Sequence, residues 1–275
     1  MKPIAIIALR EIREGLRNRR VLATAALLAG LALTLALLGS APTGNVGASR
    51  LAVTVVSLSS LTSFLVPLIA LVLTHDTIAG ELDRGTMVLL LSYPLARWHV
   101  VIGKFAGHVV MLGLATAVAY GAAGLALWLG AADDDSAVAA FCTLIGTSIL
   151  LGAAFVATGT LVSTLARDPR TAAGIALGVW LASVLLYDMA LLGLLIADQG
   201  RTLRAPLVQA LLVANPTDAY RLLNLTGLPE VGQFAGLSGL AGHLAVAPAT
   251  LLAALGLWVA APLAASVAVF ARRQV

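Results

Sequence analysis

Long apolar stretches separated by short polar segments dominate the pattern of this chain. Each stretch reaches the length of about 18 apolar residues that indicates a membrane-crossing helix, and each holds few or no charges. Because lipid offers no hydrogen bonds to an open strand, we expect the stretches to be helical. The six predicted spans are Val21–Gly39, Leu51–Thr74, Phe105–Gly130, Val138–Ala166, Ala173–Ala197 and Ala249–Ala271.

The composition indicates the same class of protein. The chain has 275 residues, of which 60% are hydrophobic and 11% charged, and its mean hydropathy is +0.99. A water-soluble domain carries roughly 25% charged residues, so this chain has too little polar surface to face water throughout. We therefore predict an all-α membrane protein with a single transmembrane domain over residues 1–275.

Lys and Arg are distributed unevenly between the two sides of the predicted spans. Of 17 such residues, 13 fall on one side, in residues 1–20, the loop 75–104, the turn 167–170 and the C-terminus. The other side holds Arg50, Arg201, Arg204 and Arg221. By the positive-inside rule, both termini are cytoplasmic. The net charge of +4 thus reflects membrane orientation, and we expect no nucleic-acid partner.

Residues 1–20 have the pattern of an amphipathic helix. Such a helix lies in the headgroup layer with its arginines toward anionic lipid, either as an anchor or as part of a partner's docking surface. A cleaved signal peptide is disfavoured, because the apolar run 21–39 exceeds the ~7–15 residues of a signal-peptide core. The apolar positions at helical spacing are Ile4, Ile7, Ala8, Ile12 and Leu16.

The loop 75–104 is longer than a turn between two spans requires. Asp76 is predicted to cap a short helix, and Gly85 to end it. Pro94 then ends the apolar run Met87–Leu91, which is too short to cross a bilayer. We expect this run to pack at the cytoplasmic face, against a partner protein or as an interfacial helix–turn–helix without one.

The same loop resembles the cytoplasmic loop of ABC-2-type permeases. The resemblance lies in Asp76-x-Ile78-Ala79-x-Glu81-x3-Gly85-Thr86-x3-Leu90-x-Ser92-x-Pro94-x2-Arg97, followed by Gly103-Lys104. It implies that the chain forms a homodimer in a bacterial inner membrane. It also implies that the coupling helix of each copy enters a cleft of a separate ATP-binding-cassette ATPase. The candidate ATPase-coupling residues are Asp76, Glu81, Arg84, Gly85 and Thr86.

Within this family, the segment from Asn215 to Arg221 resembles permeases of the nitrous oxide reductase maturation system. That resemblance implies a NosF-like ATPase and a NosD-like periplasmic accessory protein, which serve assembly of a copper–sulfur cluster. The permease would move a sulfur or copper species, or transmit conformational change to the periplasmic partner. The candidate contacts to that partner are Asn215, Pro216, Tyr220 and Arg221.

Missing motifs restrict the activity of the chain itself. The phosphate-binding pattern GxxxxGK[ST] does not occur, so we expect no enzyme activity and no cofactor here, with ATP and Mg bound by the partner subunit. HExxH and GxSxG are also absent, which disfavours an intramembrane enzyme. The remaining alternative is an ATP-independent secondary transporter or channel, which normally carries several intramembrane charges.

One acid, Asp188, lies deep inside a predicted span. A charge there costs roughly 2.5–3.5 kcal/mol at the bilayer centre, so we expect Asp188 to face protein or water, in a structural role or in translocation or gating. His108 and Met111 share a helix face, but the chain has one Cys and four Met, and we predict no metal site. The external segment 198–248 is expected to contact a partner, with its short apolar pieces on the outer surface.

Overall fold

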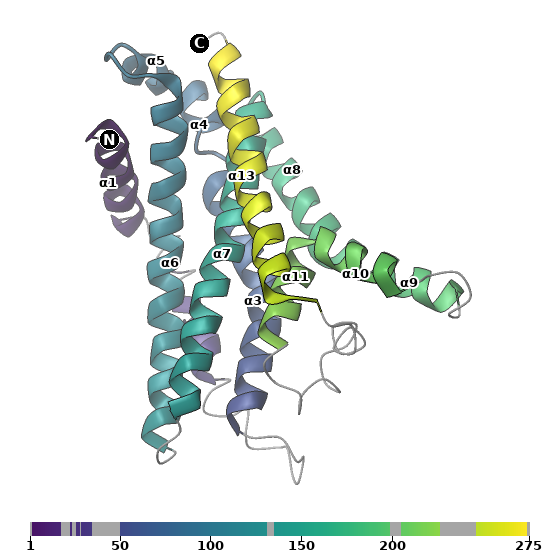
Figure 1. Ribbon diagram of the computed structural model, residues 1–275. Helices are drawn as coiled ribbons and strands as arrows, with labels where there is room; N and C mark the ends of the chain where they lie inside the picture. Colours follow the sequence, from purple (N-terminus) through teal and green to yellow (C-terminus); the bar gives the residue numbers. More distant parts are fainter. Residues whose placement is uncertain are drawn as a thin grey trace.

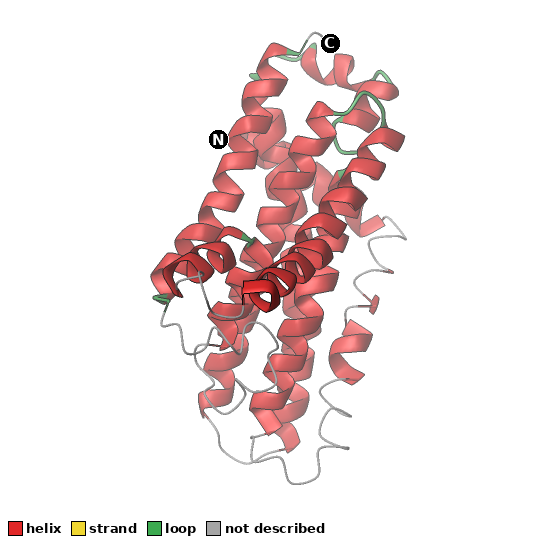
Figure 2. Ribbon diagram, turned by 90° about the vertical axis from the view of Figure 1, so that its right-hand side faces the viewer, coloured by secondary structure: helices red, strands yellow, loops and turns green. Residues whose placement is uncertain are grey.

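Every regular element that the structure describes is a helix. The computed structural model describes residues 2–17, 23, 26–27, 29–34, 50–130, 135–198, 205–225 and 246–273. Figure 2 shows these helices running past one another with short loops between them. In chain order they are α1 (Lys2–Arg17), α3 (Arg50–Thr74), α4 (Ala79–Asp83), α5 (Thr86–Leu91), α6 (Arg97–Gly130), α7 (Asp135–Leu165), α8 (Pro169–Trp180), the π-helix η1 (Leu181–Leu186), α9 (Tyr187–Asp198), α10 (Ala205–Ala214), α11 (Pro216–Leu225) and α13 (Pro248–Arg272).

Five helical stretches in the described part of the chain are long and apolar enough to cross a membrane. They are Thr54–Asp83, Arg97–Leu125, Ala139–Leu165, Pro169–Asp198 and Pro248–Arg272, and they overlap the second to sixth predicted spans. Most of the first predicted span, Val21–Gly39, lies outside the described residues. Both chain ends lie at the end of the bundle that holds α4 and α5, here called the terminal end (Figure 1).

Helix α7 forms the centre of the bundle and packs against α3, α6 and α13. Its small residues allow the neighbouring backbones to approach closely, as in other helices that associate in lipid. A Cβ at Gly152 would lie 2.7 Å from Leu112 Cδ2, and a Cβ at Gly159 would lie 1.9 Å from Thr74 Oγ1. These two glycines therefore fix how α6 and α3 sit against α7.

Helix α1 runs alongside the first turns of α6 (Figure 1). A Cβ at Gly103 would lie 2.8 Å from Ile7 Cβ, and one at Gly107 would lie 2.6 Å from Glu11 Cβ. The sequence therefore places glycines on α6 where α1 crosses it. The face of α1 that packs inward includes Ile7 and Glu11, whereas Leu16, expected on the apolar face, is exposed. The placement of α1 in the lipid headgroup layer stays a prediction.

The π-helix η1 interrupts the α-helical geometry of the fifth predicted span, Ala173–Ala197. Such a segment leaves a backbone carbonyl without its usual partner and frequently marks a functional position. Here the Ser183 carbonyl accepts a hydrogen bond from Asn215 Nδ2 at 2.8 Å. Beyond η1, α9 leads away from the bundle (Figure 1), and the Tyr187 hydroxyl at its start donates to the Leu211 carbonyl of α10.

Part of the segment predicted to be external folds back into the bundle. Helix α11 packs against α3, α7 and α13, and Ala219 and Tyr220 on it are fully buried. The expectation that the short apolar pieces of this segment lie on the outer surface is therefore wrong for α11. Its polar groups find partners inside, because Tyr220 Oη lies 2.9 Å from Ser148 Oγ on α7.

Candidate functional site

The turn between α4 and α5 presents an exposed ridge at the terminal end. Gly85 has a φ of +69°, a left-handed conformation that favours glycine, and it ends α4 as predicted. Asp76 does not cap α4, so that prediction is wrong. The free amides of Ile78 and Ala79 instead donate to Ser163 Oγ on α7 at 2.9 and 3.0 Å. The coupling ridge, as we call it, consists of the exposed residues Asp83, Arg84, Gly85, Thr86, Val88 and Leu89.

The predicted coupling residues divide between this ridge and the protein interior. Arg84, Gly85 and Thr86 are exposed on the ridge, whereas Asp76 is half-buried. Glu81 is only 7% exposed and points into the bundle. Any contact between Glu81 and a second protein must therefore act through its neighbours in this chain.

A buried lysine fixes the position of Glu81. Lys104 on α6 donates to Glu81 Oε1 at 2.8 Å and to Glu11 Oε1 on α1 at 2.5 Å. This inner cluster, made of Glu11, Glu81 and Lys104, thereby joins α1, α4 and α6. It borders a polar cavity of about 290 Å³ whose other lining residues include Asp76, Arg84 and His108.

Sequence reasoning assigned no role to Lys104 or Glu11, although a signal was present. Glu11 follows Ile7 by four residues, so a charge interrupts the apolar face of α1. Lys104 stands beside the first turn of a predicted span. Burying a charge in such a position costs free energy unless the charge is paired. Glu11 and Lys104 therefore could have been predicted to pair with each other.

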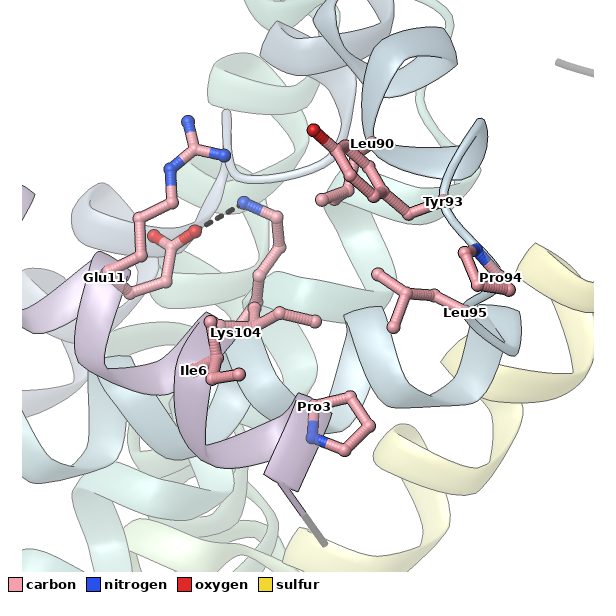
Figure 3. A pocket seen from close by; sticks show the side chains of 10 residues that line it. Pro3, Ile6, Glu11, Leu90, Tyr93, Pro94, Leu95 and Lys104 are labelled. Atoms are coloured by element: carbon pink, nitrogen blue, oxygen red, sulfur yellow. Dashed lines mark hydrogen bonds and ion pairs between the residues drawn. The ribbon is translucent and has the colours of Figure 1, made fainter.

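An apolar cavity of about 520 Å³ lies on the other side of the inner cluster. Figure 3 shows Pro3 and Ile6 of α1 facing Tyr93 and Leu95, with the ion pair between Glu11 and Lys104 at its edge. The cavity therefore separates α1 from the segment that follows α5. The lining residues are Pro3, Ile6, Ile7, Arg10, Glu11, Leu90, Tyr93, Pro94, Leu95 and Lys104.

Two arginines hold the helix ends at the terminal end of the bundle. Arg97 donates to the Phe270 carbonyl at 3.1 Å, and to two further carbonyls at the C-terminus of α13. Arg273 donates to the Ala166 carbonyl at 2.9 Å, at the end of α7. Cationic groups satisfy the free carbonyls of a helix C-terminus and its partial negative charge. Arg97, part of the family pattern, thus has a structural role in this chain.

The acid singled out inside a span, Asp188, pairs with an arginine that is distant in sequence. Arg221 on α11 donates to Asp188 Oδ2 on α9 and to Asp218 Oδ1 at 3.3 Å. Its Nε also donates to Ser63 Oγ on α3 at 3.0 Å. This outer cluster, made of Asp188, Asp218 and Arg221, joins α9 to α11.

The other residues predicted to contact a periplasmic partner also lie within the fold. Asn215 and Pro216 begin α11 with a capping asparagine and a proline in the first turn, and Asn215 Oδ1 accepts from the Thr217 amide at 3.0 Å. Asn215, Pro216 and Tyr220 are buried, and Arg221 is partly buried. A contact between these residues and a second protein stays a prediction.

Comparison with known proteins agrees with the architecture. The family described as "ABC-2 family transporter protein" matches residues 5–275. The chain is 43% identical to the probable ABC transporter permease protein NosY of Pseudomonas aeruginosa, over 100% of both chains. It is 41% identical to the protein of the same name from Stutzerimonas stutzeri, over 99% of both chains. The chain belongs to the ABC-2 family of transporter permeases.

Proposed function

We propose that this chain is the membrane-spanning half of an ATP-driven transporter whose ATP is hydrolysed by a separate, NosF-like subunit. The observation that carries the proposal is the coupling ridge, which exposes Val88 and Leu89 beside Arg84 at the terminal end. Exposed apolar side chains next to charged ones are typical of a protein interface. In this proposal the terminal end is cytoplasmic, and ATP and Mg bind only to the partner subunit.

The inner cluster gives the ridge a rigid connection to the membrane helices. Because Lys104 holds α4 through Glu81 and α1 through Glu11, a force on the ridge reaches α1 and α6 together. An ion pair buried to this degree is costly to break, since either partner alone leaves an uncompensated charge. We therefore assign Glu81 to positioning the ridge and Arg84 to contacting the ATPase.

A homodimer is the second part of the proposal. The apolar window of Thr54–Asp83 is 61% buried within one chain, whereas that of Pro169–Asp198 is 11% buried. Helices α8 and α9 thus leave apolar surface for lipid and for a second copy. A two-fold dimer would present two coupling ridges to two ATPase subunits.

The names of the relatives support a role in nitrous oxide reductase maturation. In that role the dimer moves a sulfur or copper species, or transmits ATPase-driven conformational change to a NosD-like periplasmic protein that serves copper–sulfur cluster assembly. Asp188 would take part in translocation or gating through its pairing with Arg221.

Intact-complex mass spectrometry tests the proposal. The tagged permease is purified in mild detergent after co-expression with a NosF-like ATPase from the same organism, and we expect two copies of each subunit. Arg84→Ala should reduce the amount of ATPase that co-purifies, whereas Arg167→Ala, an exposed arginine in another turn, should leave it unchanged. A permease that never captures the ATPase would overturn the proposal.

A further inference from the structure

The outer cluster contains more acid than base. Arg221 contributes one positive charge, and Asp188 and Asp218 contribute two carboxyl groups that both pair with it. If both carboxyl groups were ionised, one negative charge would remain without compensation. An isolated ionised carboxylate in apolar surroundings is so costly that such a group usually takes up a proton instead.

Burial prevents water from compensating that surplus charge at Asp218. The Asp218 side chain is 2% exposed, compared with 23% for Asp188 and 14% for Arg221. Asp188 Oδ1 and Asp218 Oδ2 are both buried and lack a hydrogen-bond partner among the described residues. Buried polar atoms in folded proteins normally have partners, so two unpartnered oxygens in one cluster indicate a missing donor.

The neighbouring helices supply no second cation in the part of the chain that the structure describes. On α3, Ser63 accepts from Arg221, and the Phe64 ring lies 5.3 Å from the guanidinium carbon. On α9, the Tyr187 hydroxyl donates to the Leu211 carbonyl of α10 at 2.6 Å. Arg221 is therefore the one cation that forms ion pairs with these two acids among the described residues.

We propose that Asp188 and Asp218 bind one proton between them, and that this proton fastens α9 to α11. A proton on one carboxyl group supplies the missing donor and removes the surplus negative charge. The other carboxylate then stays ionised and paired with Arg221. Two carboxyl groups that share one proton are a known consequence of placing like charges side by side.

The electrostatic surroundings of Asp218, which lies outside the five spans, agree with this assignment. Burial, together with the adjacent Asp188 carboxyl group, raises the pKa of Asp218 to about 7 in spite of the opposing effect of Arg221. Asp218 therefore exchanges its proton near neutral pH. Loss of the proton would weaken the attachment of α9 to α11. Helix α9 follows the π-helical turn of its span, and α11 reaches into the bundle.

The pH dependence of thermal unfolding tests the proton site without any need for transport. The full-length permease is melted in detergent between pH 5 and pH 8. In the folded protein Asp218, with its pKa raised to about 7, keeps a proton up to neutral pH, whereas an aspartate in the unfolded chain loses it near pH 4. Stability should therefore fall as pH rises from 5 to 7, by a few degrees of Tm per pH unit, and then level off.

Asp218→Asn imitates the protonated acid and should keep the Tm that the native protein has at pH 5. It should also lose the downward slope between pH 5 and pH 7. Asp168→Asn is the matched control, because Asp168 is an aspartate that pairs with the Thr171 amide rather than with an acid, and it should keep the slope. An Asp218→Asn variant that is destabilised at every pH with its slope intact would overturn the proposal.

Two further measurements exclude other occupants and cover a variant that fails to fold. Infrared spectra at pH 6 should show the carbonyl stretch of a protonated carboxyl group, and Asp188→Asn should remove it as Asp218→Asn does. An unchanged band in both variants would contradict a shared proton. The native Tm at pH 8 is also compared in sodium, potassium and choline chloride. An increase with sodium or potassium chloride but not with choline chloride would assign the site to a metal cation instead of a proton.

Discussion

Two clusters with the same formal charges lie in different surroundings in this molecule. The inner cluster places Lys104 between Glu11 and Glu81, and the outer cluster places Arg221 between Asp188 and Asp218. The inner cluster borders a polar cavity that Arg84 also lines. The outer cluster has no second cation within the described residues and holds two unpartnered carboxyl oxygens, compared with one, Glu81 Oε2, in the inner cluster. Surroundings, rather than the charges themselves, decide whether such a cluster serves as a fixed joint or as a proton site.

The largest expected effect comes from removing the cation of the inner cluster. Lys104→Met leaves two acids buried without a partner and should cost about 4 kcal/mol of unfolding free energy. Unfolding in mixed detergent micelles measures the loss. Adding Glu11→Gln and Glu81→Gln to the same chain should restore most of the stability. A Lys104→Met variant as stable as the native protein would show that the inner cluster does not hold α1, α4 and α6 together.

Removing the cation of the outer cluster should have an effect that depends on pH. Arg221→Met should cost about 3 kcal/mol at pH 8, above the raised pKa of Asp218, and less at pH 5, where the proton on Asp218 replaces part of the lost guanidinium charge. The same micelle assay at the two pH values measures the difference. Equal losses at both pH values would remove the distinction between the two clusters.

The scaffold of the outer cluster can be weakened without touching its charges. Asn215→Ala removes the cap of α11 and the hydrogen bond to the Ser183 carbonyl in the π-helix, and should cost about 2 kcal/mol. The slope of Tm between pH 5 and pH 7 should remain, because the carboxyl groups are intact. Gln209→Ala on α10, a substitution of another amide in the same segment, serves as the control and should change stability by less than about 0.5 kcal/mol.

The smallest expected effect concerns the scaffold of the inner cluster. Gly103→Ala places a Cβ 2.8 Å from Ile7 Cβ and should push α1 away from α6, at a cost of about 1 kcal/mol. Gly121→Ala on the same helix meets no atom within 4 Å and should be neutral or slightly stabilising. Equal behaviour of the two variants in the melting assay would show that α1 does not depend on close contact at Gly103.

Much of the architecture could be predicted from local patterns in the sequence. The apolar stretches give five spans in the described residues, and Gly85 ends α4 as expected. The family resemblance, carried by the loop after the second predicted span, is confirmed by the match over residues 5–275. These features depend on neighbouring residues, which a linear pattern records directly.

The site residues were predicted less completely, because their partners are distant in sequence. Asp188 was recognised as a costly charge, but its partner Arg221 lies 33 residues away on a helix that was expected at the outer surface. The capping of α4 was assigned to Asp76, three residues from its start, whereas Ser163 on α7 supplies it. A rule based on neighbouring residues assigns the cap to the nearest polar side chain in the sequence. In the folded chain a polar side chain on another helix lies within hydrogen-bond distance instead.

The sequence by itself determined that this chain crosses a membrane as helices and belongs to the ABC-2 permeases, since hydrophobicity, charge bias and the loop pattern are properties of consecutive residues. Only the tertiary structure decided that Glu81 is held inside by Lys104, and that α11 reaches into the bundle. It also decided that two aspartates share one arginine. The reason is physical: the free energy of a charged group depends on burial and on partners from other helices, and folding alone brings these together.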